Sequence, residues 1–376
     1  MPGFEWIDYK EENAVKKIFK DGAVLMAHGF EKTRKNFHVR EFENKAKSYF
    51  NSKNCLAVSS GTAAIKIALK SIGVKPGDEI ITQSFNFIAT IEAILDCGAK
   101  PIIANVDKSL NINVKEIEKL ITKKTKAIIP VHMLGTSCNM SFVKKLGSKY
   151  NLKIIEDNCE SVGAKYKNQF LGTIGNLGIF SFDHGKIITT GEGGMILTNN
   201  KLLAKFCREY HDHGHQNNKK FPRGKDTRKI YGFNYRMTEI QGAIGKIQLS
   251  KLKKIIQFNK KRYLALEKII SPFFEMRKIE DHTSIIYDTL IFFQKDNFKK
   301  KKIISILQKM GFGTKNLPDA MEWHCSYFWK HSLEKKQVQN SIKTYNILKN
   351  CIAVPILKKK TVFDYQLLGK AILNFF

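Results

Sequence analysis

Short continuous apolar runs alternate with amphipathic segments from about residue 40 to residue 210. The apolar runs cover residues 55–58, 79–82, 101–106, 126–131 and 152–156. Continuously apolar strands are typical of a sheet that helices cover on both faces. Their alternation with helices predicts an α/β fold with a largely parallel sheet. Because such sheets bind ligands beyond the carboxyl ends of their strands, we expect the functional site there.

The second half of the chain follows a different pattern. Residues 211–229 (HDHGHQNNKKFPRGKDTRK) are polar, basic and irregular, which predicts a long functional loop. Residues 237–268 have helical spacing, and the remainder combines one strand-like run at 284–293 with amphipathic helices. We expect a large domain over 1–255, whose N-terminal segment can pack on the smaller domain, and a small α+β domain over 256–376.

The chain is strongly basic, with 64 Lys and Arg against 34 Asp and Glu and a formal net charge of +30. Such a charge raises the possibility of nucleic-acid binding. The basic residues are scattered, however, and no nucleic-acid module accompanies them. We therefore predict no nucleic-acid partner, and note that a positive field would also attract an anionic substrate.

Cysteine usage and hydropathy argue against a disulfide-rich, zinc-binding, secreted or membrane-spanning protein. The seven cysteines are odd in number and contain no CxxC pair, which favours neither a disulfide framework nor a zinc site. The start, MPGFEWIDYKEENAVKK, lacks the apolar core of a signal peptide, and no run approaches the length of a membrane span. We predict a soluble cytoplasmic protein without membrane insertion.

Two motifs lie where predicted strands end. Ser60-Gly61-Thr62-Ala63 joins a strand to a helix, where free N–H groups and the helix dipole suit a phosphate. An ordinary helix cap explains the same residues. In the stretch IIEDNCE (154–160), Asp157 could pair with a cationic group of a ligand, or could simply end the strand.

Two further motifs carry basic residues. In FSFDHGKIITTGEGGM (180–195), Lys186 lies in a glycine-flanked turn between two predicted strands. A lysine that forms a Schiff base needs a pKa below its usual value of about 10.4, and a solvated lysine is the alternative. In GFNYRM (232–237), Asn234 and Arg236 could contact a phosphate or carboxylate, or cap the following helix.

Together, SGTAA, IEDxxxS, SFxxxKxxxxGEGGM and GFNYRM, in this order, resemble the DegT/DnrJ/EryC1/StrS family of sugar aminotransferases. The resemblance covers nearly the whole chain and is densest over residues 55–245. It implies an enzyme that uses pyridoxal 5'-phosphate (PLP), cycling with pyridoxamine phosphate. It also implies the aspartate aminotransferase fold (fold type I), with a mostly parallel seven-stranded-type sheet and a smaller C-terminal domain.

The resemblance also implies roles for individual residues. Lys186 falls at the lysine that forms a Schiff base with PLP, and Asp157 at the carboxylate that keeps the pyridine nitrogen protonated. Phe87 falls at the aromatic ring that stacks on the pyridine, although it could be ordinary core. Asn234 falls at a residue that reaches the PLP phosphate of a neighbouring subunit, which implies a homodimer with shared sites. The remaining phosphate contacts fall at Gly61, Thr62, Ala63 and Ser181.

Two positions, Glu160 and Lys186, distinguish this chain from other branches or members of the family. Glu160 stands where the family often has Gln, which can donate to the ring hydroxyl oxygen of PLP, whereas an ionised Glu can only accept. We therefore expect Glu160 to be protonated, to bond through water or to turn away. A dehydratase branch of the family has His in place of the PLP lysine. Here Lys186 keeps the register, which favours transamination, and His184 lies either near the substrate or on the surface.

The substrate is expected to be a carbonyl sugar, with glutamate as amino donor. The start MPGFE and the loop EYHDHGHQNNKKFPRGKDTR resemble 8-amino-3,8-dideoxy-manno-octulosonate transaminases, which implies 8-oxo-3,8-dideoxy-manno-octulosonate, a lipopolysaccharide sugar acid, as acceptor. The alternatives are a nucleotide-linked 3- or 4-keto-sugar and, further off, a non-catalytic basic regulator. A metal site is not expected from the loop histidines. The candidate substrate contacts are His184, His211, His213, His215, Arg223, Arg228 and Arg236.

Overall fold

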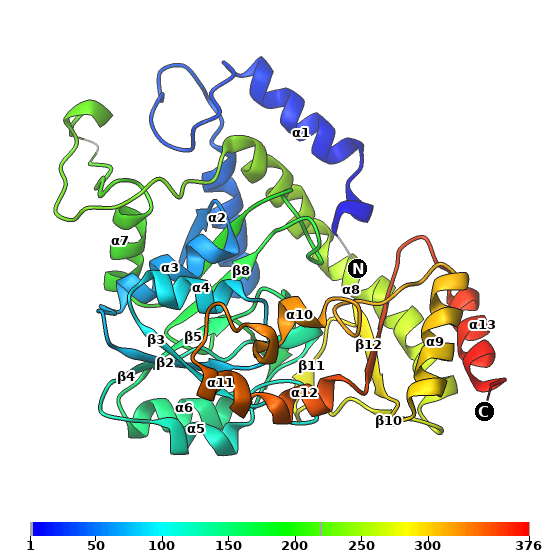
Figure 1. The fold of residues 1–376 in the computed structure, drawn as a ribbon. Coiled ribbons are helices and arrows are strands. Elements are labelled where there is room, and N and C mark those ends of the chain that lie inside the picture. Colours follow the sequence, from blue (N-terminus) through cyan, green and yellow to red (C-terminus); the bar gives the residue numbers. More distant parts are fainter. Residues whose placement is uncertain (1–2, 219, 376) are drawn as a thin grey trace.

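A seven-stranded sheet forms the centre of the larger lobe in the computed structural model, which describes residues 3–218 and 220–375 (Figure 1). The strand order is β1-β9-β8-β5-β4-β2-β3. All neighbouring strands pair in parallel except β9, which is antiparallel to both β1 and β8. The predicted α/β fold is confirmed. The strands are β1 (Asn54–Val58), β2 (Glu79–Gln83), β3 (Lys100–Ala104), β4 (Thr125–Ile128), β5 (Lys153–Asp157), β8 (Leu177–Ser181) and β9 (Gly194–Thr198).

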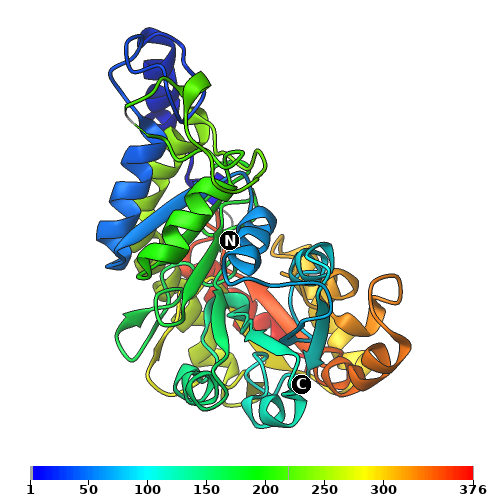
Figure 2. The same ribbon diagram turned by 90° about the vertical axis from the view of Figure 1, so that its left-hand side faces the viewer.

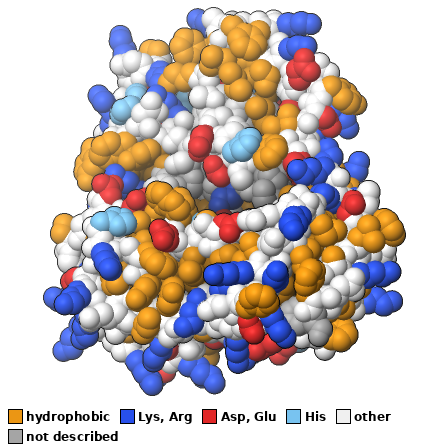
Figure 3. Space-filling model, turned by 45° about the vertical axis from the view of Figure 1, so that its right-hand side comes forward, with side chains coloured by type: hydrophobic (Ala, Val, Ile, Leu, Met, Phe, Trp, Pro, Cys, Tyr) orange, Lys and Arg blue, Asp and Glu red, His pale blue; other side chains and the backbone are white. Residues whose placement is uncertain are grey.

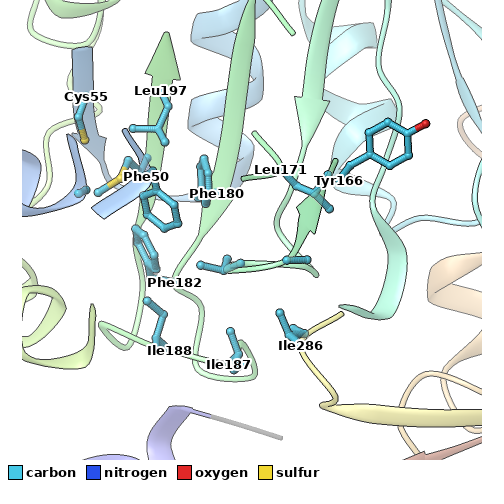
Figure 4. Close-up of a cluster of buried hydrophobic side chains, with 14 of the residues drawn as sticks. Phe50, Cys55, Tyr166, Leu171, Phe180, Phe182, Ile187, Ile188, Leu197 and Ile286 are labelled. Atoms are coloured by element: carbon cyan, nitrogen blue, oxygen red, sulfur yellow. The ribbon is translucent and has the colours of Figure 1, made fainter. Parts of the chain in front are cut away.

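Helices cover both faces of this sheet, as its continuously apolar strands require. The covering helices are α2 (His38–Phe50), α3 (Gly61–Ser71), α4 (Ala89–Asp96), α5 (Val114–Leu120), α6 (Met140–Lys149) and α7 (Lys201–Tyr210). One of the two resulting cores contains Phe50, Phe180 and Phe182 together with Ile187 and Ile188, which follow Lys186 directly (Figure 4). Burial of these two isoleucines fixes the turn that carries Lys186.

The smaller lobe is built on a three-stranded antiparallel sheet in the order β10-β12-β13. Its elements are β10 (Glu275–Met276), β12 (Thr289–Phe293), β13 (Cys351–Pro355), α9 (Asn297–Lys309) and α13 (Val362–Leu373). The single strand predicted over 284–293 is wrong in part, because β11 (Thr283–Ser284) pairs with β6 (Lys165–Tyr166), which also pairs with β7 (Gln169–Phe170). Only β12 joins the small sheet. The chain turns between them at Tyr287, whose φ is 57°.

A single helix, α8 (Glu239–Ile270), runs through both lobes. Thr238 begins it with a capping box, in which its hydroxyl accepts from the N–H of Gln241. α8 contacts α1 (Tyr9–Lys20) and α2 in its first half, and Ile269 near its end meets Gly369 of α13. The domain boundary predicted at 255/256 falls within this helix and stays a prediction.

Residues 321–348 return from the smaller lobe to the edge of the large sheet (Figures 1 and 2). They form α10 (Met321–His324), α11 (Lys335–Asn340) and α12 (Ile342–Leu348). The side chain of Gln337 accepts from the N–H of Ile103 at 3.2 Å, and the hydroxyl of Thr344 accepts from the N–H of Val106 at 3.1 Å. This return brings C-terminal residues to the carboxyl ends of the central strands.

The distribution of basic residues can be followed on one face of the molecule. On the face shown in Figure 3, Lys and Arg side chains are dispersed among hydrophobic and acidic ones. Among the described residues, no helix is both long and apolar enough to cross a membrane.

Candidate active site

A cavity of about 600 Å³ opens where β5 and β8 end and α3 begins. It is the position predicted for a ligand of a parallel sheet. The structure brings residues from three of the four sequence motifs, and Phe87, to its wall. The predicted residues that line it are Gly61, Thr62, Phe87, Asp157, Glu160, Ser181 and Lys186.

One end of the cavity is a narrow cradle at the start of α3. Gly61 lies so close to β8 that a Cβ atom built on it would be 3.0 Å from Cβ of Ser181 and 3.3 Å from Sγ of Cys159. The hydroxyl of Ser60 accepts from the N–H of Ala63 at 3.1 Å. Ala63, a predicted phosphate contact, does not line the cavity. Its N–H instead donates to the Ser60 hydroxyl that caps the helix. The helix N-terminus and the Ser181 hydroxyl fit a phosphate group.

Asp157 lies at the end of β5 with only 4% of its surface exposed. Its Oδ2 accepts from the hydroxyl of Thr90 at 2.9 Å, and its Oδ1 accepts from the N–H of Cys159 at 3.1 Å. These two donors fix the carboxylate at the cavity wall, where it can also accept from a protonated ring nitrogen. Sequence reasoning missed Thr90, because one threonine near the start of a helix carries no distinguishing pattern.

Lys186 forms an ion pair with Glu160, and their side chains are 17% and 9% exposed. Burial acts to lower the pKa of the Lys186 ammonium, but the charge and hydrogen bond of Glu160, together with Cys159 and Asp183, raise it above the ordinary value. Burial acts to raise the pKa of Glu160, yet Lys186 and Lys315 lower it to about 2. Glu160 is therefore ionised and faces Lys186. Glu160 is thus not turned away from the cavity, and its lowered pKa argues against the protonated form; a bond to the cofactor through water stays a prediction.

Phe87 is 44% exposed and lines the cavity, so it is not an ordinary core residue. Its ring centroid is 5.5 Å from that of His324 and 6.4 Å from that of Trp323. A flat aromatic ligand could therefore meet an accessible ring face in the cavity.

The C-terminal part of the chain completes the cavity wall with Thr314, Lys315, Asn316 and His324. Nζ of Lys315 is 2.5 Å from Asp288 and 3.8 Å from Glu160. Burial lowers the pKa of His324. Sequence reasoning missed these residues, since no local pattern reveals that a segment about 130 positions after Lys186 returns to it.

The predicted substrate contacts of the 211–236 region do not line this cavity within the described part of the chain. Asp212 binds Arg223 at 2.8 Å and Arg236 at 2.6 Å, so both guanidiniums are engaged within the region itself. His215 lies 3.1 Å from Asp226. Three others, His213, Arg228 and Asn234, are exposed. Since the chain is described alone, the contact of Asn234 with a neighbouring subunit stays a prediction.

His184 is exposed on the far side of the Lys186 turn and stacks on Phe4, with ring centroids 4.4 Å apart. It does not line the cavity, so the surface alternative fits the structure. The backbone N–H of Gly3 donates to the carbonyl of Lys186 at 2.5 Å. The N-terminal segment also reaches the smaller lobe, where Glu5 accepts from the N–H of Lys358 at 2.8 Å. Among the described residues, no group of three or more His, Cys, Asp and Glu side chains could hold a metal ion.

The donors of the cavity fit PLP. A phosphate would lie against the cradle of Gly61, Thr62 and Ser181, the ring against Phe87, and the ring nitrogen against Asp157. Lys186 lies in the same cavity as the amine for the PLP carbonyl. The fold and this site define an aminotransferase of fold type I.

Comparison with known proteins then gives the family. Residues 12–367 match the DegT/DnrJ/EryC1/StrS aminotransferase family, and the chain belongs to it. It is 34% identical over 337 residues to the uncharacterized protein MJ1066 of Methanocaldococcus jannaschii, a match that covers 86% of each chain. Over 217 residues it is 42% identical to a GDP-perosamine synthase of Caulobacter vibrioides, a match that spans 57% of each chain. The solved structure of an aminotransferase from Psychrobacter cryohalolentis superposes with a TM-score of 0.87, at 25% identity, over 98% of this chain and 97% of that one.

The protein is therefore a PLP-dependent aminotransferase, as its motifs predict. The narrower prediction, an octulosonate transaminase, is not supported by these matches. GDP-perosamine synthase is named for a nucleotide-linked sugar.

Proposed function

We propose that this enzyme transfers an amino group from glutamate to a nucleotide-linked keto-sugar, in the synthesis of a surface polysaccharide such as lipopolysaccharide. The proposal is carried by the cavity that places Lys186 and Asp157 on one wall, in a chain similar to a GDP-perosamine synthase. A GDP-linked keto-sugar is accordingly the first acceptor to test. This proposal replaces the octulosonate as the leading candidate.

Bound PLP supplies an electron sink for the carbon that exchanges its amino group. Asp157 keeps a proton on the ring nitrogen, and Thr90 holds this carboxylate in place. Lys186 holds the cofactor and, once released from it, takes a proton from the Cα atom of the donor. In the second half of the cycle, Lys186 returns a proton to the carbon that receives the amino group.

The remaining lining residues orient the reactants. The cradle at Gly61, Thr62 and Ser181 holds the cofactor phosphate, and the exposed face of Phe87 limits the tilt of the ring. The protein works as a homodimer in this proposal, with Asn234 reaching the neighbouring site. Its support is the exposure of Asn234 beside the exposed aromatic rings of Tyr231 and Phe233.

The first experiment tests the role of Lys186. Purified protein incubated with PLP should show a visible absorption band that glutamate bleaches. In a separate sample without glutamate, borohydride should reduce the C=N bond to the lysine and fix the cofactor covalently on the peptide that contains Lys186. A Lys186→Ala variant should lack the fixed cofactor, while Lys309→Ala, which alters an exposed lysine of α9, should keep it. Fixation on a different lysine would refute the assignment.

The second experiment tests the acceptor. GDP-, UDP- and dTDP-linked keto-sugars and 8-oxo-3,8-dideoxy-manno-octulosonate would be offered separately, with glutamate as donor. We expect the highest kcat/KM with a nucleotide-linked sugar. Preference for the octulosonate would overturn the proposed acceptor and restore the alternative, while leaving the aminotransferase activity intact.

A further inference from the structure

Glu160 lies between two lysine side chains that come from different lobes. Its Oε1 contacts Nζ of Lys186, and its Oε2 is 3.8 Å from Nζ of Lys315. Within the described residues, Oε2 has no hydrogen-bond donor. The cation of Lys315 therefore faces the carboxylate oxygen that Lys186 leaves free.

The side chain of Lys315 is only 10% exposed, and contacts within the smaller lobe fix its position. Its Nζ is 2.5 Å from Oδ2 of Asp288, a buried carboxylate next to β12. Its N–H donates to the carbonyl of Ala353 at 3.0 Å, and the carbonyl of Asp288 accepts from the N–H of Ile356 at 2.9 Å. The strands of the smaller lobe thus place the cation, independently of the turn that carries Lys186.

The result is an alternating row of buried charges: Lys186, Glu160, Lys315 and Asp288. Other charged or titratable groups also face this row. Asp183 and Cys159 act on Lys186, and His324 acts on Glu160. Asp157 faces the same cavity. Within the row, Glu160 favours the charged form of Lys186, and Lys315 opposes that effect.

We propose that Lys315 is a positioning residue that shares the Glu160 carboxylate with Lys186, so that Lys186 gives up its proton more readily than it would beside Glu160 alone. The inference rests on the proposed role of Lys186 as the group that moves a proton, since that task needs a neutral amine. Glu160 favours the protonated form of Lys186 even beside Lys315, and without the competing cation it would favour that form more strongly.

The size of the effect follows from the geometry. Two cations on opposite sides of one carboxylate are about 6 Å apart, where an effective dielectric constant of about 20 gives a repulsion worth roughly two pKa units. Asp288 cancels part of the Lys315 charge. We therefore expect Lys315 to lower the pKa of Lys186 by about one unit, which is a tenfold change in the neutral fraction at a fixed pH.

The experiment measures Lys186 in PLP-free protein. Acetic anhydride acetylates only neutral amines, so the labelling of the Lys186 peptide across a pH series, followed by mass spectrometry, gives its apparent pKa. Lys315→Met should raise this pKa by about one unit, because it removes the competing cation. Lys315→Arg, which keeps the charge, should leave it nearly unchanged, as should Lys309→Met on the exposed face of α9.

A variant with the opposite sign separates this role from a structural one. Asp288→Asn frees Lys315 to act fully on Glu160 and should lower the apparent pKa of Lys186. The proposal is overturned if Lys315→Met leaves that pKa unchanged, or if Asp288→Asn raises it. If Lys315→Met does not fold, Asp288→Asn carries the test. Failure of the proposed function would look different, because borohydride would then fix PLP on another lysine whatever the labelling shows.

Discussion

The hydrogen bond from Thr90 to Asp157 offers a direct test of how the site is built. Both residues are buried, and the hydroxyl donates to Oδ2 at 2.9 Å. Thr90→Val keeps the shape of the side chain and removes the donor. A hydrogen bond to a charged group contributes about 1.5–3 kcal/mol to the free energy of unfolding. The added methyl group returns at most about 0.8 kcal/mol, so we expect a net loss of about 1–2 kcal/mol.

The assay is urea unfolding of PLP-free protein at pH 7, followed by tryptophan fluorescence. Thr90→Val should lower the midpoint without changing the slope, whereas Thr90→Ser, which keeps the hydroxyl, should stay close to the wild type. A cycle with Asp157→Ala isolates the pair, since the valine substitution should cost little once the carboxylate is absent. Because Thr90→Val also loosens the carboxylate that faces the ring nitrogen, the Kd for PLP should rise about tenfold for each 1.4 kcal/mol of binding free energy that is lost. Equal midpoints for Thr90→Val and the wild type would refute this account of Asp157.

Three further predictions concern other parts of the molecule. Gly61→Ala should weaken PLP binding at least tenfold in an absorbance titration, because the new methyl group would press against Ser181 in the phosphate cradle. An unchanged affinity would show that this cradle does not bind the PLP phosphate. Burial outweighs Arg34 and raises the pKa of Glu239 to about 7, so the contribution of Glu239 to stability should fall as pH rises from about 4.5 to 7. Glu239→Gln removes this contribution, so in urea titrations at several pH values its stability relative to the wild type should rise over that range; a constant difference would contradict the assignment. Arg277 donates to three backbone carbonyls at 2.6–3.0 Å, so Arg277→Met should lower the free energy of unfolding by about 3 kcal/mol or more, and a loss below about 1 kcal/mol would contradict it.

The central sheet could be predicted from sequence because each of its parallel strands is buried on both faces. β1 begins one residue before the predicted run at 55–58. β5 lies one residue later than the predicted run at 152–156. The run at 284–293 failed, because hydrophobicity does not reveal that its two ends pair with different sheets. Within 211–218 and 220–229 the chain is irregular, as predicted, apart from a short 3₁₀ turn at Arg223–Lys225.

The site was predictable to the extent that its residues follow strands in the first 200 positions. Lys186 and Asp157 stand at such positions, and the structure places both in one cavity. The charges around Glu160 were only partly predictable, because its first partner Lys186 stands in a sequence motif, whereas Lys315 is placed in the cavity wall through its hydrogen bond to Ala353 of β13. Long-range contacts of this kind leave no periodic trace in the sequence.

The continuity of α8 has a consequence for protein engineering. At about 1.5 Å per residue, its 32 residues form a rod of roughly 48 Å that belongs to both lobes. A chimaera with a relative's smaller lobe, joined in the middle of this rod, would have to match the rotation of two half-helices about their axis. A mismatch of one residue there turns the grafted lobe by about 100°. Both possible junctions outside the helix avoid that error: one before Thr238 transplants α8 with the smaller lobe, and one after Ser271 leaves α8 whole in the larger lobe.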